Sequence, residues 1–84
     1  MRLNPPLTTG EVAAQMNAIL ESRVYDGRAI RAEIDSGRLR AVIGTRPTRR
    51  RLRVTEAEFL RWAALVLHDD ELRRLRRQLT AAES

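Results

Sequence analysis

The middle of this chain changes its hydrophobic period, and this change limits the possible folds more than any other feature. Residues 39–43 and 51–54 place apolar side chains at every second position, whereas the segments on either side repeat them every three or four. A period of two is typical of a β-strand, and a period near 3.6 is typical of an amphipathic helix. The sequence therefore predicts helices on both sides of a β-hairpin.

The beginning of the first helix is marked by a capping box. Thr8 is followed three residues later by Glu11, and the two side chains can satisfy each other's backbone N–H groups. Apolar residues at helical spacing then continue to about residue 23. The preceding residues 1–7 contain a Pro-Pro pair and are expected to form an extended leader.

A second helix is expected over residues 27–36. Asp26 is a favourable N-cap for it, and Gly37 would follow its C-cap in a left-handed conformation. The spacing places Ala29, Ile30 and Ile34 on the inward face and turns Arg28, Arg31 and Asp35 outward.

The hairpin is expected over residues 39–54, with its turn in the segment TRPTRR around Pro47. Its tip and outer face carry five arginines: Arg46, Arg49, Arg50, Arg51 and Arg53. Thr55 and Glu58 then form a second capping box, which opens another helix. On that helix, Phe59 and Trp62 could stack on bases, but their helical spacing beside alanines favours a place in the core.

The C-terminal segment contains leucines at spacings of three and four. Together with His68, they resemble the a and d positions of a short coiled coil: Leu65, Leu72, Leu75 and Leu79. This seam could join a second protomer or another protein, although packing on the domain's own core would give the same pattern. The segment HDD at 68–70 either interrupts the helix or lies within it.

Positive charge is concentrated in the middle third of the chain. All 16 basic residues are arginine, and the formal net charge is +5. Residues 23–54 contain ten arginines against three acidic residues, which gives +7 for this segment alone. A solvated surface is usually mixed in sign, so this one-sided block favours binding to phosphate groups.

The arginines divide into two candidate DNA contacts. Arg28 and Arg31, on the outer face of the second helix, could form bidentate hydrogen bonds with guanine in the major groove. Arg38, just beyond Gly37, is expected to contact phosphate, and the hairpin arginines the backbone or the minor groove.

Other classes of protein receive little support from the sequence. The absence of cysteine excludes disulfides, thiolate zinc sites and a cysteine nucleophile, and His68 alone cannot form a metal cluster. No paired acid and base or phosphate-binding glycine loop indicates an enzyme, and no cofactor is expected. Neither a transmembrane run nor a signal-peptide pattern is present, so a cytoplasmic location is expected.

The predicted order of helix, turn, helix, hairpin and helix is that of a winged helix-turn-helix domain over residues 8–68, followed by a C-terminal helix over residues 69–84. Within it, three segments resemble the MerR-like and excisionase-like small DNA-binding proteins: LTTGEVAAQM at 7–16, AIRAEIDSGRLRAV at 29–42 and RLRVTEAEFLRWA at 51–63. Relative to that pattern, about seven additional residues lie around Asn17 to Arg23. A first helix longer by two turns would accommodate them.

This resemblance implies an excisionase, also called a recombination directionality factor. Such proteins bind and bend double-stranded DNA at attachment sites, cooperatively, and direct an integrase toward excision. The alternative on the same fold is a small phage or plasmid transcriptional repressor. An antitoxin or protein-interaction adaptor would instead use the C-terminal leucine seam as its main surface.

Overall fold

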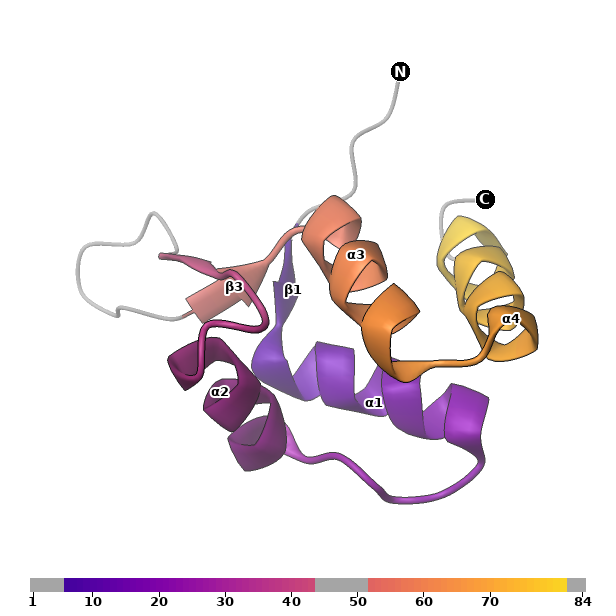
Figure 1. The fold of residues 1–84 in the computed structure, drawn as a ribbon, viewed down its shortest axis with the longest axis horizontal. Coiled ribbons are helices and arrows are strands. Elements are labelled where there is room, and N and C mark those ends of the chain that lie inside the picture. The colour runs from indigo at the N-terminus through magenta and orange to yellow at the C-terminus, as the bar shows by residue number, and fades with distance from the viewer. Residues whose placement is uncertain (1–5, 44–51, 82–84) are drawn as a thin grey trace.

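Four helices and a small antiparallel sheet make up the described part of the chain, residues 6–43 and 52–81 of a computed structural model (Figure 1). The helices are α1 (Thr9–Leu20), α2 (Gly27–Asp35), α3 (Glu56–Val66) and α4 (Asp69–Ala81). The strands are β1 (Leu7–Thr8), β2 (Val42–Ile43) and β3 (Leu52–Val54). The expected mainly α fold with an antiparallel strand pair is confirmed at this level.

The sheet has a third strand that the sequence did not indicate. Its order is β1-β3-β2, and both neighbours of β3 are antiparallel to it. Leu7 pairs with Val54, so the end of the expected leader is a strand. A run of only two residues after a Pro-Pro pair is too short to show alternation.

The strand before the hairpin turn is shorter than predicted. Residues 39–41 lie outside β2: the Leu39 N–H donates to the Glu33 carbonyl near the end of α2, and the Arg40 N–H donates to the Glu58 carboxylate. Leu39 is nevertheless buried and Val42 exposed, as the alternation predicted. The turn segment TRPTRR lies outside the described residues.

The predicted starts of α1 and α2 are confirmed. The Thr8 hydroxyl accepts from the Glu11 N–H at 3.1 Å, while the Glu11 carboxylate accepts from the Thr8 N–H at 3.0 Å. Asp26 Oδ1 accepts from the Ala29 N–H at 2.8 Å and caps α2. Gly37 has a φ of +83°, a conformation that favours glycine after a helix C-cap.

The first helix ends earlier than predicted, at Leu20 and not at about residue 23, with Glu21 in the left-handed conformation. The following loop is held by the side chain of Asn17. Its Oδ1 accepts from the Val24 and Tyr25 N–H groups at 3.0 and 2.9 Å, and its Nδ2 donates to the Tyr25 carbonyl at 2.7 Å. These three hydrogen bonds replace the helical ones that a continuation of α1 would have made.

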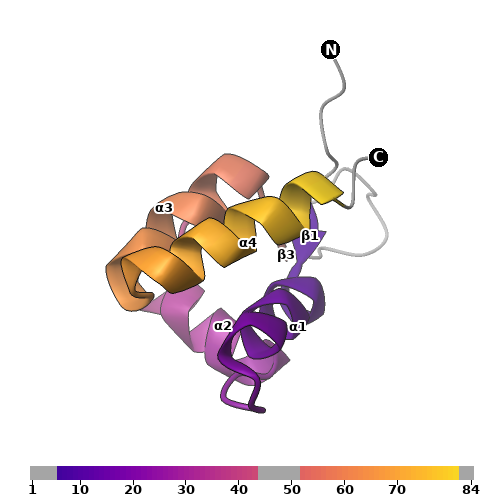
Figure 2. The ribbon, with the colours of Figure 1, turned by 90° about the vertical axis from the view of Figure 1, so that its right-hand side faces the viewer.

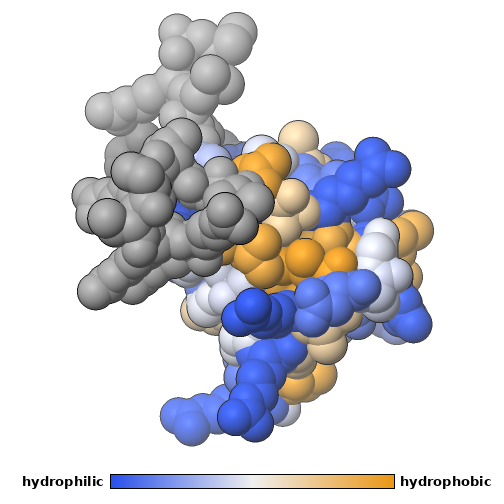
Figure 3. Space-filling model, turned by 90° about the vertical axis from the view of Figure 1, so that its left-hand side faces the viewer, coloured by the Kyte–Doolittle hydropathy of each residue, from blue (hydrophilic) through white to orange (hydrophobic). Residues whose placement is uncertain are grey.

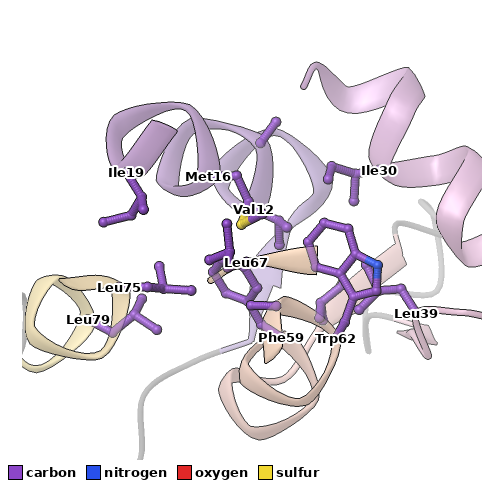
Figure 4. Close-up of a cluster of buried hydrophobic side chains, with 13 residues drawn as sticks. Val12, Met16, Ile19, Ile30, Leu39, Phe59, Trp62, Leu67, Leu75 and Leu79 are labelled. Carbon is purple, nitrogen blue, oxygen red and sulfur yellow. The ribbon is translucent and has the colours of Figure 1, made fainter. Parts of the chain in front are cut away.

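The core is centred on α3. Trp62 and Phe59 are fully buried, as predicted, and Trp62 lies between α1, α2 and the segment after α2 (Figure 4). The Tyr25 ring meets the Trp62 ring edge to face, with centroids 5.7 Å apart. Ile30 is the fully buried residue of α2, so one side of this helix faces the core.

The chain bends between α3 and α4, so no continuous coiled-coil seam exists. Leu67 is extended, with a ψ of 151°, and the His68 N–H donates to the Glu71 carboxylate at 2.9 Å. Helix α4 therefore folds back against α1 and α3 (Figure 2).

The bend separates the leucines of the predicted seam. Leu75 is fully buried and Leu79 nearly so, facing Ile19 of α1 (Figure 4), whereas Leu65 is 70% exposed on the other side of the bend. Leu72 is half-buried against the same core. The structure therefore shows the alternative origin of the pattern: these leucines of α4 pack on the domain's own core.

We expect Leu75→Ala to lower the free energy of unfolding by about 2–5 kcal/mol, because it leaves a cavity between α4 and α1. Leu65→Ala is the matched control. Its side chain is mostly exposed, and the expected change is below about 0.5 kcal/mol. Urea unfolding followed by circular dichroism measures both, and equal effects would contradict the packing described here.

Candidate nucleic-acid interface

Helix α2 presents two arginines on the side opposite its buried residue. Arg28 and Arg31 are both exposed, whereas Ile30 has no exposed surface. The same exposed side includes Asp35 near the C-terminal end of the helix. Figure 3 looks at this end of the molecule, where hydrophilic side chains lie to the right of a central apolar area and below it. The described structure thus places the two predicted base-reading residues on an accessible helix face.

Arg38 lies immediately after α2, with 71% of its side chain exposed. Its guanidinium is 3.9 Å from the Glu33 carboxylate, which is long for an ion pair. Exposed pairs contribute about 0–1 kcal/mol, so this contact does not prevent Arg38 from turning toward a phosphate.

The structure describes only one of the five hairpin arginines. Arg53 lies on β3, the central strand, and its guanidinium donates to the Leu52 carbonyl at 3.1 Å. The Arg53 side chain is half-buried, so it is less accessible than we predicted for a residue on the outer face of the hairpin. Arg46, Arg49, Arg50 and Arg51 lie outside the described residues.

A clamp between α3 and the segment after α2 fixes the position of Arg38 and Arg40, and sequence reasoning missed it. The Arg61 guanidinium donates to both oxygens of Glu58, with a shortest distance of 2.5 Å. Arg61 also donates to the Arg38 carbonyl at 2.9 Å, and Glu58 accepts from the Arg40 N–H at 3.0 Å.

The clamp changes the role predicted for Glu58. Thr55 does cap α3, since its hydroxyl accepts from the Glu58 N–H at 3.2 Å. The Glu58 carboxylate, however, accepts from Arg61 and Arg40. The i,i+3 spacing of Glu58 and Arg61 was the available signal, but the two backbone partners come from another element.

The clamp is electrostatic as well as geometric. The hydrogen bond from Arg61 is the main cause that lowers the Glu58 pKa to about 2, and the hydrogen bond from the Arg40 backbone lowers it further. The same pairing raises the pKa of Arg61. Both groups are therefore charged at neutral pH, and the segment carrying Arg38 and Arg40 remains attached to α3.

No three metal-ligating side chains come together within residues 6–43 and 52–81, and no helix in that part could cross a membrane. Comparisons with protein-family models, curated proteins and solved structures found no match.

The clamp predicts a pH-dependent contribution to stability. A folded-state pKa below the unfolded value means that the charged Glu58 stabilises the fold above about pH 4.5, and that this contribution is lost as the pH falls toward 2. Glu58→Gln should therefore be less stable than the wild type at pH 7, and the difference should shrink between pH 4.5 and 2.

Urea midpoints measured across this pH range test the prediction. Arg61→Gln is the matched control, because it removes the other partner. The double variant should be little worse than either single one if both act through the same contact. A stability difference that does not change with pH would contradict the electrostatic role of Glu58.

Proposed function

We propose that this chain is a winged helix-turn-helix DNA-binding protein in which α2 is the recognition helix. The observation that supports this most is the pair of exposed arginines on α2, opposite the buried Ile30. The major groove is about 12 Å wide and admits one helix, and arginine forms bidentate hydrogen bonds with guanine O6 and N7. A helix whose other face is fixed in the core can present such side chains in a constant register.

The surroundings of α2 support contacts to the DNA backbone. Arg38 and Arg40 follow the helix at positions that the Glu58–Arg61 clamp holds. The hairpin contributes Arg46, Arg49, Arg50 and Arg51 in sequence, with no acidic residue between them. We propose that the hairpin is the wing and binds the phosphate backbone or the minor groove beside α2.

Within this class, we propose that the protein is an excisionase that binds and bends attachment-site DNA and directs an integrase toward excision. The sequence resemblance, which covers about residues 7–67, favours this role. A small transcriptional repressor would use the same α2 surface and is the second candidate. An adaptor that depends on the leucines of α4 is less supported, because Leu75 and Leu79 are buried.

Footprinting on DNA flanking the gene tests DNA binding and gives the spacing of the sites. If an integrase is encoded near the gene, excision between the integrated ends, measured with that integrase with and without this protein, then separates the two candidates. Stimulated excision supports the excisionase role. A promoter footprint without stimulation supports the repressor.

Arg28→Ala and Arg31→Ala should relax sequence preference, because each bidentate contact contributes about 1–3 kcal/mol of discrimination against the wrong base. Arg38→Ala is the matched control. A phosphate contact carries no sequence information, so its loss should weaken all sites alike. Fluorescence anisotropy on a panel of single-base variants of the footprinted site measures both effects. Unchanged preference in both α2 variants would mean that α2 does not read bases.

Replacing Arg49, Arg50 and Arg51 together by alanine should flatten the slope of log K against log salt by about two to three, since each phosphate contact contributes about 0.9. Specific and non-specific duplexes should be weakened nearly equally. Binding measured between 50 and 200 mM salt gives the slope. A slope equal to that of the wild type would show that the hairpin does not meet DNA.

A further inference from the structure

Helix α4 has a cationic side that the α2 surface does not include. Its acidic residues, Asp69, Asp70 and Glu71, all lie in the first turn, where the helix dipole favours negative charge. Its arginines lie further along the helix: Arg73, Arg74, Arg76 and Arg77. The acidic and basic residues are therefore separated along α4, although their charges nearly balance in the sequence.

The arginines of α4 are exposed, because the leucines of this helix occupy its inward side. Arg73 lies 3.6 Å from the Asp70 carboxylate, and both side chains are largely exposed. No carboxylate of a described residue forms an ion pair with Arg74, Arg76 or Arg77. Arg73 and Arg76 also line a surface hollow of about 250 Å³ beside Asp69 and Leu72.

The two cationic surfaces lie on opposite sides of the molecule. Helix α2 lies at the left of Figure 1 and α4 at the right, with α1 and α3 between them, and α4 faces the viewer in Figure 2. A straight duplex bound at α2 therefore does not reach α4. Bending 20–30 base pairs by 40–90° already costs on the order of 1–6 kcal/mol, and reaching the opposite side requires a larger bend.

We propose that α4 binds the phosphate backbone of a second DNA segment, so that one molecule bridges two duplexes. This inference rests on the proposed DNA binding by α2. Charge complementarity favours a polyanion here, because three arginines that pair with no carboxylate of a described residue lie within four positions of the helix. We expect the arginines on the exposed side of α4 to contact phosphate groups. Because phosphate contacts carry no sequence information, this contact is independent of the DNA sequence.

The test uses the full chain and two duplexes carrying the footprinted site. One duplex is immobilised and saturated with protein, and capture of a second, labelled duplex is measured. The α4 variant carries Arg74→Gln, Arg76→Gln and Arg77→Gln, which keep good helix formers at these positions. Its urea midpoint is compared with that of the wild type to verify the fold.

We expect the α4 variant to bind a single duplex as the wild type does but to lose capture of the second. Its residual capture should depend less on salt, with the slope reduced by about two to three. The substitution Asp70→Asn should have the opposite effect on capture of the second duplex. It removes a negative charge and frees Arg73, so capture should increase.

Several results would overturn the inference, and they are distinguishable from failure of the proposed function. If the wild type binds a single duplex but captures no second one, or if the α4 variant captures normally, only the second surface is refuted. If the α4 variant loses binding to a single duplex, the second surface is also refuted, because α4 and α2 would then contact the same duplex. A wild type that binds no duplex refutes both.

A dimer could also bridge two duplexes, through two copies of α2. Sedimentation velocity of the free wild-type protein therefore accompanies the capture assay. Monomeric protein with α4-dependent capture supports the inference, whereas a dimer in solution overturns it as the explanation of capture.

Discussion

Burial of the Trp62 side chain is the interaction on which the other elements depend. Its ring is enclosed by α1, α2 and the segment after α2, and Tyr25 meets it from the loop between those helices. In a chain of this length one core must serve every element, because little apolar surface can be removed from water. The direction in which α2 faces is thus determined by what its inward side packs against.

Local signals predicted the helix starts well. Thr8, Asp26 and Thr55 each cap a helix as expected, because a capping contact spans only three residues and is written directly in the sequence. Gly37 was equally clear, since few other residues adopt its left-handed conformation easily.

Features that depend on distant partners were not predictable in the same way. Asn17 resembles any polar residue on a helix until the loop folds back and supplies three backbone partners. The Glu58–Arg61 clamp likewise needs the backbone at Arg38 and Arg40, about twenty residues away. Leucine spacing in α4 gave the correct face but not its partner, since core packing and self-association use the same period.

The position of β3 between β1 and β2 has a consequence for how the chain folds. Leu7 and Val54 are 47 positions apart in the sequence (54 − 7), so they become neighbours only when the chain between them has closed into a loop. The entropy cost of such a closure grows slowly with loop length, but it precedes the contacts that compensate for it. Helices α1 and α2 are consecutive in the sequence and contact each other, so they can pack together early in folding. Although β1 precedes the other described elements in the chain, we therefore expect it to be among the last to pair with its neighbour.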